Sequence, residues 1–168
     1  AYIASNEGRR TKPYEDKSSL RSKGKRTVGI GHLITDPKDD REMTEPEIEQ
    51  LFVSDLTEKV TQARAKIGKR FDTLPEPAQV AIIDGFFRGD MSGSPEALKL
   101  IKAGKLDEAA TEYLNNAEYR ASVKSNAEGK PHGVAGRMER NAAALRAAVV
   151  RGVLSDAPPI IAQPLENE

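Results

Sequence analysis

Two acidic residues and a hydroxyl residue lie close together near the start of this chain. Asp16 follows Glu7 by nine residues, and Thr27 comes eleven residues after Asp16. Hydrolysis of a glycosidic bond uses such a pair, because one carboxyl group protonates the leaving oxygen while a second carboxylate activates water or attacks the sugar. A hydroxyl group can bond to a carboxylate and to water, so Thr27 could hold that water. In a chain with 26 Asp and Glu residues, solvated or capping carboxylates are the alternative.

The elements predicted around these residues give the two carboxyl groups different surroundings. Residues 2–9 read as a short helix with Glu7 near its end, where the helix dipole favours the protonated carboxyl that a general acid needs. Residues 13–33 alternate strand and turn signals and predict a small antiparallel hairpin sheet. Asp16 and Thr27 fall at the ends of two of its strands, so strand pairing would bring them together.

The remainder of the chain predicts a helical protein. A long helix should begin at Thr44, with Glu47 completing a capping box, and should run to Gly68. A long helix after a small sheet often bridges two lobes. Apolar spacing and Pro or Gly boundaries predict further helices over 74–89, 94–104, 106–114 and 134–152, a loop over 124–131, and a flexible tail or linker over 155–168.

Composition narrows the possible partners. Lys plus Arg and Asp plus Glu both number 26, so no overall basic field favours nucleic acid or an anionic membrane. There is no Cys for disulfides or thiolate chemistry, and two His residues are too few for most metal sites. No apolar run approaches the ~20 residues of a membrane span, and no signal peptide is recognisable. We therefore expect no membrane span, metal or cofactor.

The order of residues in the first segment resembles a known signature. Glu7-Gly8, five residues, Tyr14, one residue and Asp16, followed by a segment from Thr27 to Thr35, is similar to the active-site signature of phage-type lysozymes, the T-even phage family in glycoside hydrolase family 24. The resemblance covers about residues 2–152, because further segments fall in family order: 47–55, 81–89, 106–110, and Arg137 with Arg140 on the last helix.

This resemblance implies an α+β lysozyme-like fold in one domain over residues 1–154. A β-hairpin lobe would occupy about 10–43, a linking helix about 44–68, and a helical lobe about 69–154. The implied activity is that of an endo-acting muramidase, which cuts the β-1,4 bond between N-acetylmuramic acid and N-acetylglucosamine in peptidoglycan with inversion. It needs no metal or cofactor.

The resemblance also assigns roles to individual residues. Glu7 would be the acid, Asp16 the base, and Thr27 the residue that orients water. The residues expected against the sugar are Gly31, Leu33 and Phe86.

Four further residues are expected to support the site. Arg137 and Arg140 would reach the first helix, although a solvated arginine face is the alternative. His32 would be structural rather than catalytic, with Asp55 as its carboxylate partner.

The chain departs from the T-even pattern in two places. It has five more residues between Asp16 and Thr27, and Lys17 to Arg26 contains five basic residues and no acid. We expect a longer hairpin tip, which is either a solvated loop or a contact to anionic wall polymer. Where the family places polar sugar-binding side chains, this chain has Ala97 and Glu112.

Other functions remain open at this stage. A cell-wall-binding or structural module on this fold would lack hydrolysis, and a lytic transglycosylase would share the acid but need no base. The expected place of action is the periplasmic wall, reached by holin-type release, a virion or a secretion machinery. The chain starts at Ala1 without Met, which favours a monomeric domain of a larger or processed protein over a free endolysin.

Overall fold

The computed structural model describes residues 2–15, 25–130 and 133–155. A short helix α1 (Tyr2–Glu7) precedes a three-stranded antiparallel sheet of β1 (Arg10–Glu15), β2 (Arg26–Gly29) and β3 (His32–Leu33), in the order β1-β2-β3. A 3-10 turn, η1 (Pro37–Asp39), leads to the long helix α2 (Glu45–Ile67). The remaining helices are α3 (Arg70–Thr73), α4 (Glu76–Arg88), α5 (Pro95–Ala103), α6 (Leu106–Tyr113), α7 (Ala117–Ala127) and α8 (Gly133–Ser155). The predicted α+β lysozyme-like class is confirmed.

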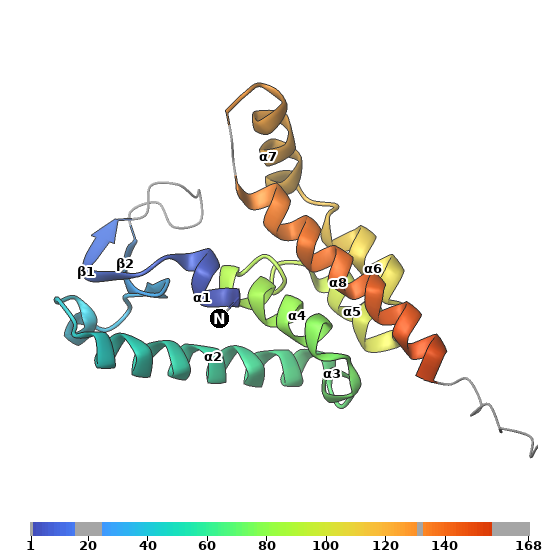
Figure 1. The fold of residues 1–168 in the computed structure, drawn as a ribbon, viewed down its shortest axis with the longest axis horizontal. Helices are drawn as coiled ribbons and strands as arrows, with labels where there is room; N and C mark the ends of the chain where they lie inside the picture. The colour runs from blue at the N-terminus through green and yellow to red at the C-terminus, as the bar shows by residue number, and fades with distance from the viewer. Residues whose placement is uncertain (1, 16–24, 131–132, 156–168) are drawn as a thin grey trace, which may run out of the picture.

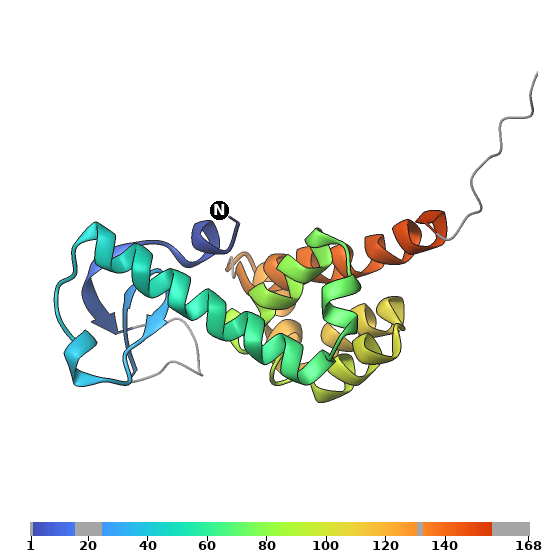
Figure 2. The same cartoon turned by 90° about the horizontal axis from the view of Figure 1, so that it is seen from below.

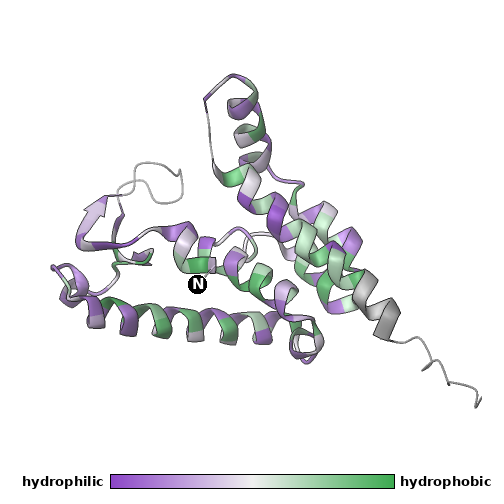
Figure 3. Ribbon diagram, viewed as in Figure 1, coloured by the Kyte–Doolittle hydropathy of each residue, from purple (hydrophilic) through white to green (hydrophobic). Residues whose placement is uncertain are grey.

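Helix α2 joins the sheet to the other helices, as its predicted length indicated (Figure 1). It starts where predicted, because the Glu47 carboxylate accepts a hydrogen bond of 2.7 Å from the Thr44 backbone N–H. It ends at Gly68, whose φ of 77° favours glycine. Hydrophobic and hydrophilic residues alternate along the helix (Figure 3). This pattern is expected for a helix with one side packed against the protein and the other in solvent.

Two hydrophobic cores lie at opposite ends of α2. The smaller one lies under the sheet, and we call this end the sheet lobe; its buried members are Ile3, Val28, Ile30, Met43, Ile48 and Phe52. The larger one fills the helical lobe, where α8 packs against α4, α6 and α7 (Figure 2). Phe87 of α4 packs edge-on against Phe52 of α2 in the sheet-lobe core, with ring centroids 5.7 Å apart. The neighbouring Ile83 of α4 packs against both cores.

Helix α1 lies between the lobes and contacts both of them (Figure 1). Its only buried side chain, Ile3, belongs to the sheet-lobe core. Asn6 and Glu7 instead reach acceptor and donor groups on α4 and α8. This division of contacts brings the predicted acid to the junction of the lobes.

Several details of the helical lobe differ from prediction, and the short helix α3 was not predicted. The loop predicted over 124–131 is wrong for residues 124–127, because α7 continues to Ala127. Helix α7 escaped prediction because Ser122 is its only buried residue, so it has no apolar stripe. Ser94 also does not cap α5 with its side chain; its hydroxyl donates to the Asp90 carbonyl instead.

Candidate active site

Glu7, the predicted acid, is the last residue of α1, and its side chain is 18% exposed. Its Oε1 accepts a hydrogen bond of 2.6 Å from Nη2 of Arg137 on α8. The expected reach of Arg137 to the first helix is therefore present. The pairing joins residues 130 positions apart, at the place where α1 meets the helical lobe.

The same arginine is held from its other side by Asp84 of α4. Arg137 Nε donates to Asp84 Oδ2 at 2.8 Å, and Arg137 Nη2 donates to Asp84 Oδ1 at 2.7 Å. The Asp84 side chain is fully buried. A bidentate pair of this kind fixes the plane of the guanidinium group.

The charge of Arg137 is secure in this setting. Burial works to lower the pKa of Arg137, but its hydrogen bond to Asp84 and the charges of Glu7 and Asp84 outweigh this effect and raise the pKa above its usual value. Arg137 is therefore a permanent cation between two carboxyl groups.

Gly31 brings the sheet lobe against Glu7. It lies in the turn between β2 and β3 with φ of 72°, a conformation that other residues rarely adopt. A Cβ atom at this position would lie 2.8 Å from Glu7 Oε2. Only glycine allows the turn to approach the carboxyl group this closely, so Oε1 faces the helical lobe and Oε2 faces the sheet lobe.

Thr27 lies in β2, opposite Tyr14 of β1 and Leu33 of β3, and it is 7% exposed. Asp16 and most of the basic insert, residues 17–24, lie outside the described residues. The predicted meeting of Asp16 and Thr27 therefore stays a prediction.

The two apolar residues expected against the sugar lie in different surroundings. Leu33 on β3 is 39% exposed and open to contact. Phe86 is only 3% exposed and belongs to the core of the helical lobe. Because its ring is used in packing, little of its surface remains for a sugar, and its contact with the substrate stays a prediction.

The remaining supporting residues have the contacts that were expected. His32 Nδ1 lies 2.9 Å from Asp55 Oδ2, so β3 is tied to α2. Burial raises the pKa of Asp55, and the bond to His32 opposes this effect. Arg140 Nε donates to the Tyr2 hydroxyl at 3.3 Å, which is the predicted contact with α1.

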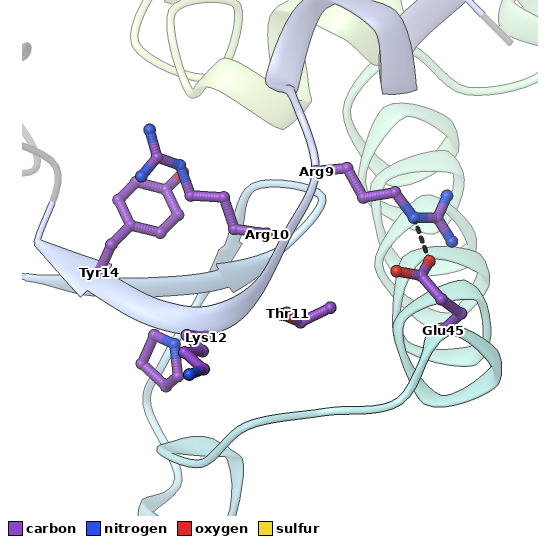
Figure 4. A pocket seen from close by; sticks show the side chains of 7 residues that line it. Arg9, Arg10, Thr11, Lys12, Tyr14 and Glu45 are labelled. Atoms are coloured by element: carbon purple, nitrogen blue, oxygen red, sulfur yellow. Dashed lines mark hydrogen bonds and ion pairs between the residues drawn. The ribbon is translucent and has the colours of Figure 1, made fainter.

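A basic hollow lies beside β1, close to the point where the chain enters the insert. It is lined by Arg9, Arg10, Thr11, Lys12, Pro13, Tyr14 and Glu45 (Figure 4). Arg9 is paired with Glu45 and Glu49, whereas the Arg10 guanidinium stacks on the Tyr14 ring, 4.5 Å from its centroid.

Neither a metal site nor a bilayer-spanning helix is found in the described part of the chain. Within 2–15, 25–130 and 133–155, no group of three or more His, Cys, Asp or Glu side chains is arranged to hold a metal ion. The helices in these ranges are also too short or too polar to cross a bilayer.

Sequence reasoning missed the polar residues behind Arg137. Asn141 of α8 donates to Asp84 Oδ2 at 2.8 Å, and Asn6 of α1 donates more weakly to Oδ1 at 3.4 Å. One signal was available, because Asp84 interrupts the apolar run from Val80 to Phe87. A carboxylate among buried positions requires a buried cation or several donors.

A small antiparallel sheet, a long connecting helix and a helical lobe that holds a glutamate at their junction define a lysozyme-like protein. The family model described as phage lysozyme matches residues 4–130, and the chain belongs to this family. The match ends before α8, so the Glu7–Arg137 contact is an independent structural observation. A search of curated proteins found no match. The chain is thus a peptidoglycan-degrading lysozyme that acts on the bacterial cell wall.

Proposed function

We propose that this chain is an endo-acting muramidase that hydrolyses the β-1,4 bond between N-acetylmuramic acid and N-acetylglucosamine with inversion. The observation that supports it best is the position of Glu7. Its carboxyl group is held at the junction of the lobes by Arg137 at 2.6 Å and lies against Gly31. A general acid requires this kind of fixed and partly enclosed carboxyl group.

The contacts of Glu7 specify which oxygen carries the proton. Oε1 accepts a hydrogen bond from the cationic Arg137, so its lone pair is less available to bind a proton. The proton therefore belongs on Oε2, the oxygen next to Gly31. From there it passes to the glycosidic oxygen as the bond to the sugar breaks.

Asp16 and Thr27 complete the proposal as base and water-orienting residue. Glu15 is the last described residue of β1, and it pairs with Arg26, the neighbour of Thr27 in β2. Asp16 follows Glu15 directly in the chain. An inverting pair needs its carboxyl groups about 6.5–9.5 Å apart so that a water molecule fits between them and the sugar.

The decisive experiment follows clearing of purified murein and analyses its first products. We expect hydrolysis that yields a reducing end, with the anomer first formed by NMR opposite in configuration to the bond cleaved. Glu7→Gln and Asp16→Asn should each lower the rate of clearing by about 10²-fold or more. Retention of configuration in the first product would reject inversion.

The same assay separates the two rival functions. A lytic transglycosylase would leave an anhydro end and would keep full activity in Asp16→Ala. A wall-binding module would sediment with murein but would not clear it. Either result would reject the muramidase.

A further inference from the structure

Asp84 occupies a site that is built for a carboxylate rather than for an amide. Four N–H groups converge on its two oxygens. Oδ2 accepts from Arg137 Nε and Asn141 Nδ2, both at 2.8 Å, while Oδ1 accepts from Arg137 Nη2 at 2.7 Å and from Asn6 Nδ2 at 3.4 Å. An amide would direct its own NH₂ group at two of these donors, whereas an ionised carboxylate accepts from all of them.

The Asp84 site is connected directly to the proposed acid. One nitrogen atom, Nη2 of Arg137, donates both to Asp84 Oδ1 at 2.7 Å and to Glu7 Oε1 at 2.6 Å. Because Asp84 holds the guanidinium through Nε as well, Arg137 cannot turn toward Glu7 independently. The place and direction of the donor that meets Glu7 are thus set by α4.

Charge is shared across the same three groups. Arg137 supplies one positive charge, and Asp84 and an ionised Glu7 would supply two negative ones. At these distances the charge of Arg137 acts on Glu7 and Asp84 together. On its other side, Glu7 faces the uncharged Gly31 of the sheet lobe.

We propose that Asp84 is a positioning residue for the acid of this lysozyme, which orients Arg137 toward Glu7 Oε1. This role rests on the proposed function of Glu7 as the acid. Asp84 is fully buried and does not touch the substrate; it acts through Arg137.

The test is the pH profile of murein hydrolysis by Asp84→Asn. Removing the negative charge leaves Arg137 to favour an ionised Glu7, so the alkaline limb of the profile should move to lower pH, by about one pH unit for charges at this range. Misplacement of the acid should also lower kcat by roughly tenfold or more with little change in KM. If Asp84→Asn does not fold, Asp84→Ser removes the same charge and leaves room for water.

A matched control exists at the end of the same helix. Asp90 is another buried carboxylate, 4% exposed, but it accepts from Arg88 Nε and the Tyr113 hydroxyl, both at 2.8 Å, rather than from the arginine of Glu7. Asp90→Asn should lower the unfolding temperature and move the alkaline limb less than Asp84→Asn does, because Arg137 acts on Asp90 only through its charge. The control thus separates the general effect of losing a buried carboxylate from the specific effect of losing Asp84.

The outcomes distinguish this role from the proposed function. If Glu7→Gln is inactive but the alkaline limb of Asp84→Asn stays in place or moves to higher pH, the positioning role is overturned. If Glu7→Gln retains activity, the proposed function itself fails. An NMR titration of the Glu7 carboxyl group, which requires no catalysis, should then still show ionisation at lower pH in Asp84→Asn, and an unchanged titration would overturn the electrostatic coupling.

Discussion

The two lobes hold their polar groups by different means. In the helical lobe, Asp84 and Arg137 are buried together, and each satisfies the other with two hydrogen bonds. In the sheet lobe, the ion pairs of Arg9 with Glu45 and Glu49 lie on the surface, with more than a third of each side chain exposed. Buried pairs are rigid but costly to break, whereas surface pairs contribute little.

This difference shows how the work is divided at the active site. The helical lobe holds Arg137 as a fixed cation against Glu7. The sheet lobe places the Gly31 turn beside Glu7 and contains the buried Thr27. Substitutions in the two lobes should therefore have different consequences.

The largest effect is expected from Glu7→Gln. The amide cannot donate a proton to the leaving oxygen, so murein clearing should fall about 10²–10⁴-fold, the usual contribution of a general acid. Glu45→Gln, which alters an exposed carboxyl group of the sheet lobe, is the control and should retain activity. A comparable loss of murein-clearing activity in both variants would show that Glu7 has no special role as the acid.

Arg137→Met tests the cost of the buried pair. Without the guanidinium, Asp84 is left as a buried charge without its cation, and the free energy of unfolding should fall by about 3–5 kcal/mol. Arg9→Met removes the exposed pairs of the sheet lobe and should change stability little. Chemical denaturation of both variants measures the contrast, and similar losses in both would contradict it.

Gly31→Ala should affect both stability and activity. Its positive φ strains an alanine by about 1–2 kcal/mol, and the new methyl group would push against Glu7 Oε2. Gly68→Ala also places alanine at a positive φ, 77°, but nothing lies within 4 Å of the added Cβ. Both variants should lose stability, and only Gly31→Ala should lose activity; full activity in Gly31→Ala would show that the close approach has no role.

The smallest effect is a pH-dependent one at the start of α2. Hydrogen bonds from Arg41 and from the Thr44 backbone lower the pKa of Glu47 to about 2. A lowered pKa stabilises the folded chain above the unfolded value and loses that effect as the pH falls through the folded one. Glu47→Gln should therefore unfold at a slightly lower temperature than the parent at pH 6, and this difference should disappear near pH 2. A difference that stays constant with pH would exclude the carboxylate as its source.

Local signals predicted most of the fold but only part of the site. The start of α2 at Thr44 and its end at Gly68 depend on neighbouring residues, so they are readable from the sequence. The partner of Glu7 was expected only through a family resemblance. Asp84 was not expected, because its contacts with Arg137 and Asn141 span 53 and 57 positions, and an acidic residue in an apolar run does not say which distant cation it meets. Helix α7, which buries little, lacked the periodicity that prediction requires.

Glu7 and Arg137 are 130 positions apart, so their contact can form only late in synthesis of the chain. During synthesis Glu7 leaves the ribosome well before Arg137, which emerges with α8 after the sheet lobe and helices α2 to α7. Helix α1 has six residues, too few to be stable without its neighbours. A nascent chain therefore carries the acid without the group that aligns it, and the site is assembled only when α8 closes against α1.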